Sequence, residues 1–318
     1  MGNLTKAETA RFLLEADRIV ILTHRRPDGD TLGSAAFLCR GLRQLGKQVW
    51  ILPNPEITEK YASLHEGLTK PCVEEDDTIV AVDTASAQML PEAYRALLGS
   101  ISLRIDHHAT ATTFTEHELV EPEAAACGEI VYDVLTQMGV VLDIPMANAL
   151  YTAVSTDTGC FRYANTTEHS FAVAAACAAV SPDLFRLNQL YFDTNSLARL
   201  RLQGWMVENA RFLSGGKIVI CAIPYALEQE LGVTEDDMEN ISGFPRSIAG
   251  VYIAATLRQN SDGLVKLSVR AVPGYDAGAI CATFGGGGHK GAAGASLRLS
   301  LEDAVAAVEK AMPHIESN

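Results

Sequence analysis

The chain has 318 residues, of which 48% are hydrophobic and 20% are charged, so it is long enough to form two domains with ordinary buried cores. This composition excludes extensive disorder, and the sequence contains no uncharged apolar stretch of about 18 residues that could cross a membrane. The net charge of −14 argues against a protein that wraps long duplex nucleic acid, but it leaves short anionic substrates open.

The first 180 residues alternate short apolar runs with helical patterns. The runs typical of buried strands cover residues 18–23, 48–52, 78–82 and 101–105, and the helical patterns cover 31–45, 128–138 and 145–154. This alternation predicts stacked βα units in a mostly parallel, doubly wound sheet. The N-terminus has no apolar signal-peptide core, so we expect a cytoplasmic protein.

The pattern changes after Pro182. Residues 184–205 are more polar and helical, which is typical of a connector between domains. Further strands are expected over 217–222, 248–257 and 264–269, with a hairpin turn at Asp262-Gly263 and a closing helix over 301–312. The sequence therefore predicts a domain over residues 1–183, a helical connector over 184–205 and a smaller α/β domain over 206–318.

Histidine and aspartate clusters stand where the predicted elements of the first domain end. They are His24, Asp28 and Asp30, then Asp83, then Asp106, His107 and His108, and finally Asp157. Because ligands of open parallel sheets collect at the carboxyl edge of the strands, these clusters predict one dinuclear metal site. The spacing of Asp28 and Asp30 can send one carboxylate to each metal if Gly29 tightens the turn.

The chemistry of this donor set favours particular metals. Carboxylates and imidazoles without thiolates suit Mn²⁺ or Mg²⁺ better than structural zinc. Two such ions about 3.5 to 4 Å apart are typical of enzymes that direct water onto phosphorus.

The segments HRRPDGDTLGSA, VDT, DHH, STDTG and GGGGHKGAAG follow one another along the chain. In this order they resemble the motifs of the DHH phosphoesterase superfamily with a C-terminal DHHA1 domain. The length and layout are most similar to the nanoRNase and pAp phosphatase group. The resemblance implies a hydrolase that degrades short single-stranded oligoribonucleotides to mononucleotides and converts 3′-phosphoadenosine 5′-phosphate (pAp) to AMP, using hydroxide activated by two metal ions. Mn²⁺ is the expected metal, with Mg²⁺ as the alternative.

The resemblance also implies which residues bind the two ions. They are His24 and Asp28 for the first ion, Asp30, His107 and Asp157 for the second, and Asp83 as the bridge between them. In the same comparison His108 faces the substrate phosphate and assists the leaving group, and Asp106 orients its neighbours. Together with Asp83, these two are the expected catalytic residues.

In the DHHA1 segment the resemblance implies a site for substrate phosphate. Its residues are Arg270, Gly286, Gly287, Gly288 and His289. Glycines let the backbone approach a phosphate, and the planar guanidinium of Arg270 suits a distal phosphate or nucleotide. A mobile glycine loop and a surface arginine are the structural alternatives.

Several interpretations stay open from the sequence. Arg25 and Arg26 depart from the family motif and either capture anions or face solvent, while Arg162 and Tyr163 either reach the substrate or serve structure. Alternative functions are a phosphodiesterase for linear or cyclic dinucleotides, a manganese inorganic pyrophosphatase and a non-catalytic nucleotide-binding module. The chain is not expected to bind membranes, and its oligomeric state, monomer or homodimer, is left undecided.

Overall fold

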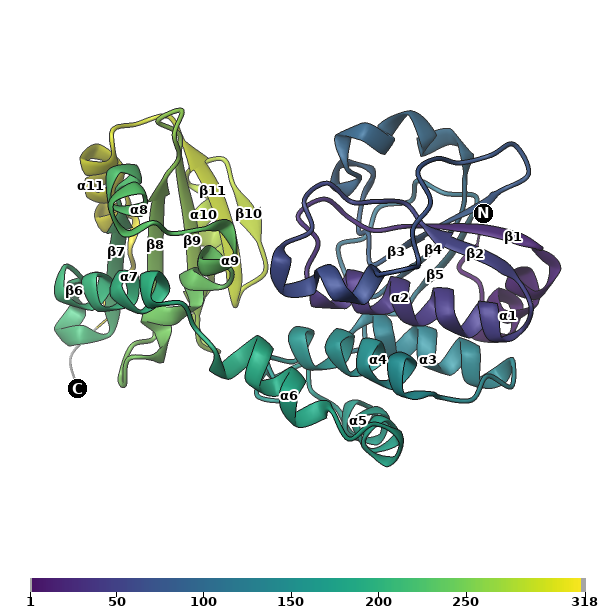
Figure 1. Cartoon of the computed structure of the whole chain (residues 1–318). Coiled ribbons are helices and arrows are strands. Elements are labelled where there is room, and N and C mark those ends of the chain that lie inside the picture. Colours follow the sequence, from purple (N-terminus) through teal and green to yellow (C-terminus); the bar gives the residue numbers. More distant parts are fainter. Residues whose placement is uncertain (1, 316–318) are drawn as a thin grey trace. The chain divides into compact units, whose positions relative to one another are not determined.

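The computed structural model describes residues 2–315, and the chain divides into two compact units, residues 1–194 and 195–318 (Figure 1). The division falls inside the stretch expected to be a connector. The helix α6 (Leu184–Asn188) and a π-helical turn (Gln189–Asp193) belong to the first unit, and α7 (Leu197–Glu208) belongs to the second. Among the described residues no helix is long and apolar enough to cross a membrane.

The first unit is built on a sheet of five parallel strands. The strands are β1 (Arg18–Leu22), β2 (Gln48–Ile51), β3 (Thr78–Val82), β4 (Ile101–Asp106) and β5 (His117–Val120). Their order is β2-β1-β3-β4-β5, and every neighbouring pair is parallel, which confirms the predicted sheet. The chain progresses in opposite directions on the two sides of the β1/β3 pair, and ligands of such sheets bind where this reversal opens a crevice.

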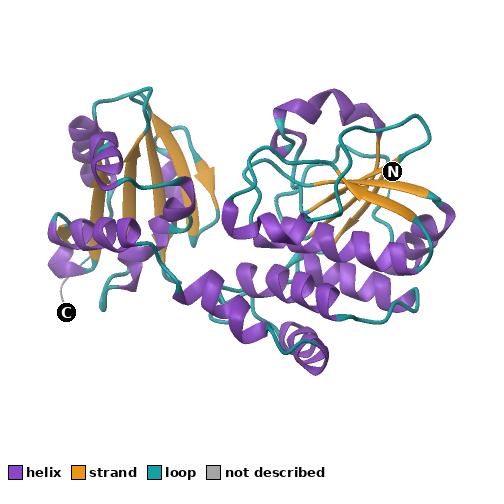
Figure 2. Ribbon diagram, viewed as in Figure 1, coloured by secondary structure: helices purple, strands orange, loops and turns teal. Residues whose placement is uncertain are grey.

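Both faces of this sheet are covered (Figure 2). The helices of the first unit, besides α6, are α1 (Lys6–Glu15), α2 (Gly29–Gln44), α3 (Cys127–Gln137), α4 (Ile144–Asp157) and α5 (Glu168–Val180). On one face α2, α3 and α4 bury a large apolar core, and Figure 1 shows these three helices side by side. On the other face the 3₁₀ helix Glu92–Ser100 packs over a smaller apolar cluster. A 3₁₀ helix also spans Glu59–His65.

The second unit holds a smaller, mixed sheet. Its strands are β6 (Arg211–Leu213), β7 (Ile218–Ile223), β8 (Ile253–Gln259), β9 (Val265–Ala271), β10 (Gly287–Gly288) and β11 (Ala292–Leu297), in the order β10-β11-β9-β8-β7-β6. Only β7 and β8 run parallel, and the other pairs are antiparallel. The remaining helices are α8 (Tyr225–Leu231), α9 (Glu235–Met238), α10 (Ala277–Ala282) and α11 (Leu301–Ala311).

The strand expected over residues 248–257 is wrong in its first half. A 3₁₀ helix over Ile241–Ser247 precedes β8, which begins only at Ile253, and Gly250 has a positive φ of 83° that interrupts an extended chain. The apolar run begins earlier than the strand because Val251 packs in the core without pairing. The hairpin turn at Asp262-Gly263 is confirmed, since β8 and β9 are antiparallel neighbours joined there.

Candidate metal centre

The loops that follow β1, β3 and β4 meet the end of α4 at the carboxyl edge of the first sheet. There the ligand atoms form three groups, each with all atoms within 4.8 Å of one another. The groups are His24, Asp28 and Asp83; Asp30, His107 and Asp157; and Asp83, His107 and His108. All six residues expected to bind metal are thus brought together, although they come from segments up to 133 positions apart in the chain.

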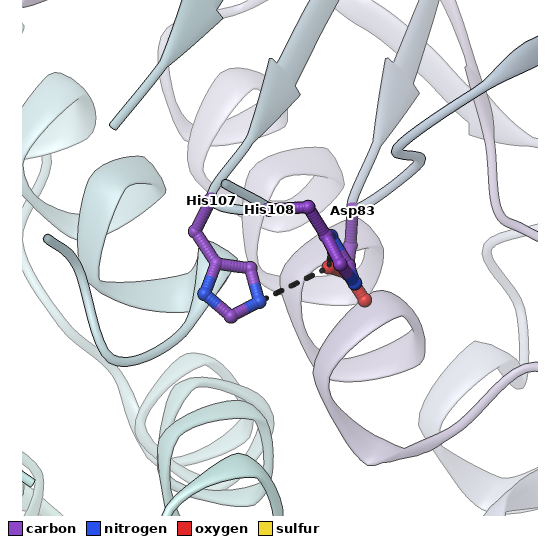
Figure 3. A group of neighbouring side chains, drawn as sticks. All are labelled: Asp83, His107 and His108. Atoms are coloured by element: carbon purple, nitrogen blue, oxygen red, sulfur yellow. Dashed lines mark ion pairs between the residues drawn. The ribbon is translucent and has the colours of Figure 1, made fainter. Parts of the chain in front are cut away.

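Asp83 stands at the centre of this arrangement. Its Oδ2 lies 3.4 Å from Nε2 of His24. Its Oδ1 lies 3.5 Å from Nε2 of His107 and 3.5 Å from Nδ1 of His108 (Figure 3). Oδ1 is buried without a hydrogen-bond partner, which is costly for a carboxylate oxygen unless a cation or proton compensates it. Asp83 also adopts a left-handed backbone with φ of 51°, a strained conformation common at functional sites.

Backbone carbonyls orient the two histidines that flank Asp83. Nδ1 of His24 donates to the carbonyl of Arg25 (2.8 Å), and Nδ1 of His107 donates to the carbonyl of Ala124 (3.1 Å). With the proton held on Nδ1, each ring directs the lone pair of Nε2 toward the carboxylates. This tautomer is the one a metal-binding imidazole needs, so the donor set fits a pair of hard divalent cations.

The two aspartates of the first loop are held in different ways. Asp28 caps α2, since its Oδ1 accepts the backbone N–H groups of Asp30 (3.1 Å) and Thr31 (3.2 Å). Asp30 lies in the first turn of α2 and is buried. The sequence predicted this helix from residue 31, whereas it begins at Gly29, so Asp28 is its N-cap and Asp30 lies inside its first turn. Gly29 is needed because a side chain there would collide with Thr156 of α4.

Asp30 is positioned by groups that the sequence did not identify. Its Oδ2 accepts the backbone N–H of Cys127 (2.6 Å), and its Oδ1 accepts the N–H of Gly128 (3.0 Å) and the hydroxyl of Ser34 (2.8 Å). The two amides belong to the first turn of α3, where unpaired N–H groups and the helix dipole favour a negative charge. The residue types in the sequence do not predict the two amide contacts, because their donors are backbone N–H groups.

A buried arginine behind the centre was also missed. Arg104 of β4 is 1% exposed, and its Nη1 donates to the carbonyls of Ala85 (3.0 Å) and Thr112 (3.2 Å), while Nη2 pairs with Glu118 (3.0 Å). Nη1 also lies 3.8 Å from Oδ2 of Asp106. Arg104 therefore connects the loop after Asp83 to the loop after Asp106. The feature of the sequence that could have identified this arginine is a charged residue within the apolar run 101–105.

Asp106 and His108 form a hydrogen-bonded pair. Nδ1 of His108 donates to Oδ1 of Asp106 over 2.8 Å, and Asp106 is fully buried. Burial opposes ionisation of Asp106, but its hydrogen bond with His108 and the nearby Arg104 lower its pKa. Burial would lower the pKa of His108, but this hydrogen bond and the charges of Asp83 and Asp106 together outweigh burial and raise the pKa of that imidazole. This hydrogen bond fixes the orientation of the His108 ring, and the catalytic role of the pair stays a prediction.

Crowded carboxylates dominate the electrostatics of the centre. Burial and the charges of Asp83 and Asp157 raise the pKa of Asp30 well above its ordinary value, and burial raises the pKa of Asp157 to about 7. Burial alone would lower the pKa of His107, yet the surrounding carboxylates raise it to about 9. Such a cluster binds protons tightly when no other cation compensates it, and divalent cations would displace those protons.

The residues expected to bind substrate phosphate lie at one end of the second sheet. Arg270 in β9 pairs in register with Ala292 of β11, and the backbone N–H of His289 donates to the carbonyl of Ala292 (2.8 Å). His289 is exposed at the turn of the β10–β11 hairpin. These contacts bring Arg270 and the glycine segment together, and phosphate binding by them stays a prediction.

The three glycines of this segment differ in their surroundings. A side chain at Gly286 would collide with the carbonyl of Gly294, and one at Gly288 would lie 2.6 Å from the carbonyl of Ala292. Gly287 is exposed and has open space around it. Close strand pairing thus accounts for two of these glycines independently of any substrate.

Arg25 and Arg26 lie on the surface beside the centre. Both are exposed; the N–H of Arg25 donates to the carbonyl of Met89 (2.7 Å), and that of Arg26 donates to Glu56 (3.0 Å). These contacts fix the loop backbone and leave the role of the two guanidinium groups undecided.

Comparison with known proteins agrees with this arrangement. The family model described as "DHH family, N-terminal domain" matches residues 18–154, and the DHHA1 domain matches residues 215–313. The chain is 33% identical over 298 residues to the bifunctional oligoribonuclease and PAP phosphatase NrnA of Thermus thermophilus, covering 92% of this chain and 89% of that protein.

Solved structures share the fold. An exopolyphosphatase-related protein from Bacteroides fragilis superimposes with a TM-score of 0.87 at 24% identity, covering 96% of this chain and 94% of that one. RecJ of Thermus thermophilus in complex with Mn²⁺ gives a TM-score of 0.55 at 16% identity, covering 96% of this chain and 54% of that one.

Proposed function

The chain belongs to the family of bifunctional oligoribonucleases and PAP phosphatases, and on that premise we propose that it hydrolyses short oligoribonucleotides to mononucleotides and pAp to AMP and inorganic phosphate. The observation that carries this proposal is the position of Asp83, which completes the ligand group of His24 and Asp28 and also lies 3.5 Å from His107 of the group with Asp30 and Asp157. Two divalent cations held close together by a shared carboxylate would supply the clamp by which many phosphoesterases bring water and phosphate together.

The residues divide into two binding sets. His24 and Asp28 would hold one cation, Asp30, His107 and Asp157 would hold the other, and Asp83 would serve both. Bound Mn²⁺, or Mg²⁺ as the alternative, supplies an activated water and neutralises charge on the phosphate. The preference for Mn²⁺ rests on the mixed imidazole and carboxylate donors.

Hydrolysis joins a water oxygen to phosphorus, breaks the bond from phosphorus to the ester oxygen and transfers a proton to that leaving oxygen. His108 is the proposed proton donor, because Asp106 holds its Nδ1 and the raised pKa of the imidazole favours its protonated form. Arg104 would act on this pair from behind, as a positioning residue that keeps Asp106 ionised.

In the second unit Arg270, His289 and the glycines at 286–288 are the proposed phosphate-binding residues. The net charge of −14 favours short substrates over long duplexes. The cytoplasmic location stays a prediction of the sequence.

The test compares four substrates with the purified full-length chain and Mn²⁺: pAp, a labelled RNA dinucleotide, a labelled RNA five-mer and pyrophosphate. Turnover of pAp and of both RNAs, abolished in Asp83→Asn and retained in the exposed control Asp76→Asn, is expected. Cleavage of the dinucleotide alone would replace the proposal with a signalling-dinucleotide phosphodiesterase. Turnover of pyrophosphate alone would indicate a pyrophosphatase, and binding without turnover would indicate a nucleotide-binding module.

A further inference from the structure

A turn that directly follows the metal-site residue Asp157 has an unusual backbone. Gly159, Cys160 and Phe161 are consecutive left-handed residues, with φ of 57°, 58° and 60°. Left-handed conformations are unfavourable for residues other than glycine, and runs of them persist only where the surroundings enforce them. A connection from α4 to α5 does not by itself require three consecutive left-handed residues.

Hydrogen bonds lock this turn onto the end of α4. The carbonyl of Thr158 accepts the backbone N–H groups of both Arg162 and Tyr163, each over 3.0 Å. The side chain of Asn165 donates to the carbonyl of Asp157 (3.1 Å) and to that of Ala125 (3.0 Å). The turn is therefore fixed to the backbone of a predicted metal ligand within the same compact unit.

The two aromatic side chains of the turn have different environments. Phe161 packs against the apolar core, where its ring lies near Tyr151 and is stacked with Phe171. Tyr163, two residues later, is 51% exposed. The partly buried ring of Phe161 anchors the turn, whereas anchoring does not explain the exposed ring of Tyr163.

Tyr163 rests on Gly159 with the face of its ring. A side-chain carbon added to Gly159 would lie at nearly the same distance from Cζ, Cε1 and Cε2 of the ring, all within 2.5 Å. A carbon in the ring plane beyond Cζ would be much farther from the two Cε atoms, so the glycine lies under the face. One face of the ring is thus supported by backbone, and the exposed area is available to a flat partner.

A cationic group accompanies the ring. Nε of Arg162 donates to the carbonyl of Gly159 (2.6 Å), which fixes the guanidinium on the same turn. Arg162 is exposed and forms no ion pair with a carboxylate in the part of the chain that the structure describes. The aromatic ring can stack with a base, and the neighbouring guanidinium can bind a phosphate, so together they match the two parts of a nucleotide.

We infer that the turn Gly159–Tyr163 is a nucleobase subsite in which a base of the substrate stacks on Tyr163 and a phosphate oxygen meets Arg162. The inference rests on the proposed function and deepens it. Stacking on an aromatic face is sequence-tolerant, because every base has a π-face, so the subsite would select nucleotides over other phosphoesters without reading sequence.

The experiment crosses a change in the enzyme with a change in the substrate. Initial rates are measured with pAp and with its base-free counterpart, 1-deoxyribose 3,5-bisphosphate, for the wild type and the Tyr163→Leu and Tyr163→Phe variants. Leucine keeps an apolar side chain over Gly159 but removes the π-face. Phe185→Ala, which removes another exposed aromatic ring of the first unit, is the matched control.

We expect Tyr163→Leu to lower kcat/KM for pAp about 5- to 150-fold, the range for one stacked base, and to change the rate on the base-free substrate less than about twofold. Tyr163→Phe and Phe185→Ala should behave like the wild type. Arg162→Met should lower kcat/KM for both substrates by a similar factor, since both carry the phosphates. Equal losses on the two substrates in Tyr163→Leu would overturn the subsite.

A binding measurement checks the contact without turnover. AMP should quench the additional fluorescence of a Tyr163→Trp variant, and ribose 5-phosphate should not; the wild type supplies the background of the chain's two tryptophans. If AMP does not quench this fluorescence, the ring has another role. If Tyr163→Leu changes the sedimentation of the protein but not its substrate selectivity, that role is one such as a subunit contact. Failure of the wild type to hydrolyse pAp would refute the proposed function instead, so the two failures are distinguishable.

Discussion

Replacing Asp83 with asparagine isolates the charge shared by the two ligand groups. The substitution keeps the side-chain volume, and asparagine tolerates the left-handed backbone at this position. Alanine would add a backbone penalty of about 1 to 2 kcal/mol, so Asp83→Asn is the cleaner change. Because one carboxylate faces both His24 and His107, the variant should lose affinity for both cations.

The magnitude can be worked out for stability as well as for rate. A cation present at 100 times its Kd stabilises the folded state by about 2.7 kcal/mol, and a unit of 194 residues gains about 2 to 4 °C in Tm per kcal/mol. Saturating Mn²⁺ should therefore raise the Tm of the first unit by about 5 to 11 °C for each of the two cations in the wild type and by little in Asp83→Asn. The loss of kcat should be on the order of 10³-fold or more.

Calorimetry with and without Mn²⁺, beside single-turnover hydrolysis of pAp, measures both effects. The metal-free variant should keep a Tm close to that of the wild type, because the charge of Asp83 repels Asp30 but attracts His24 and His107, and the two effects oppose each other. A full Mn²⁺-induced shift in Tm, or kcat within tenfold of the wild type, would refute the bridging role. A collapse of the metal-free variant would show that Asp83 is needed for folding instead.

Three further outcomes follow from the geometry. Arg104→Met should lower the free energy of unfolding by about 3 to 5 kcal/mol in urea titrations, because it leaves the buried Asp106 and the partly buried Glu118 without their cation; a loss below 1 kcal/mol would contradict this. Without metal, the pKa values of about 7 for Asp157 and about 9 for His107 mean that the folded state binds protons more tightly than the unfolded chain. The metal-free Tm should therefore fall as the pH rises from about 4 to about 9, and Mn²⁺ should reverse this fall. A metal-free Tm that rises over this pH range would contradict the prediction. Gly286→Ala should destabilise the second unit by about 1 to 3 kcal/mol in calorimetry, since the new methyl meets backbone; an unchanged transition would argue against the tight hairpin.

The local apolar pattern of the sequence predicted most strands of the first sheet. The run 78–82 coincides with β3, and the other predicted strands of this unit end within one residue of the observed ones. Continuous apolar runs separated by helical periodicity leave few alternatives to a parallel sheet. The strand β5 (His117–Val120) was not predicted, because its four residues include two charged or titratable side chains and only one is fully buried.

The sequence by itself determined the types and order of the candidate ligands, because a histidine or carboxylate that follows a buried strand can be recognised from contiguous residues. Tertiary structure alone decided how these groups are tuned. The amides of α3 reach Asp30 across 97 and 98 positions, Arg104 joins two loops, and Gly159 receives the ring of Tyr163 only because the turn folds back on itself. Backbone donors and ring faces carry no residue signature, so their roles emerge only when the chain places them against a partner.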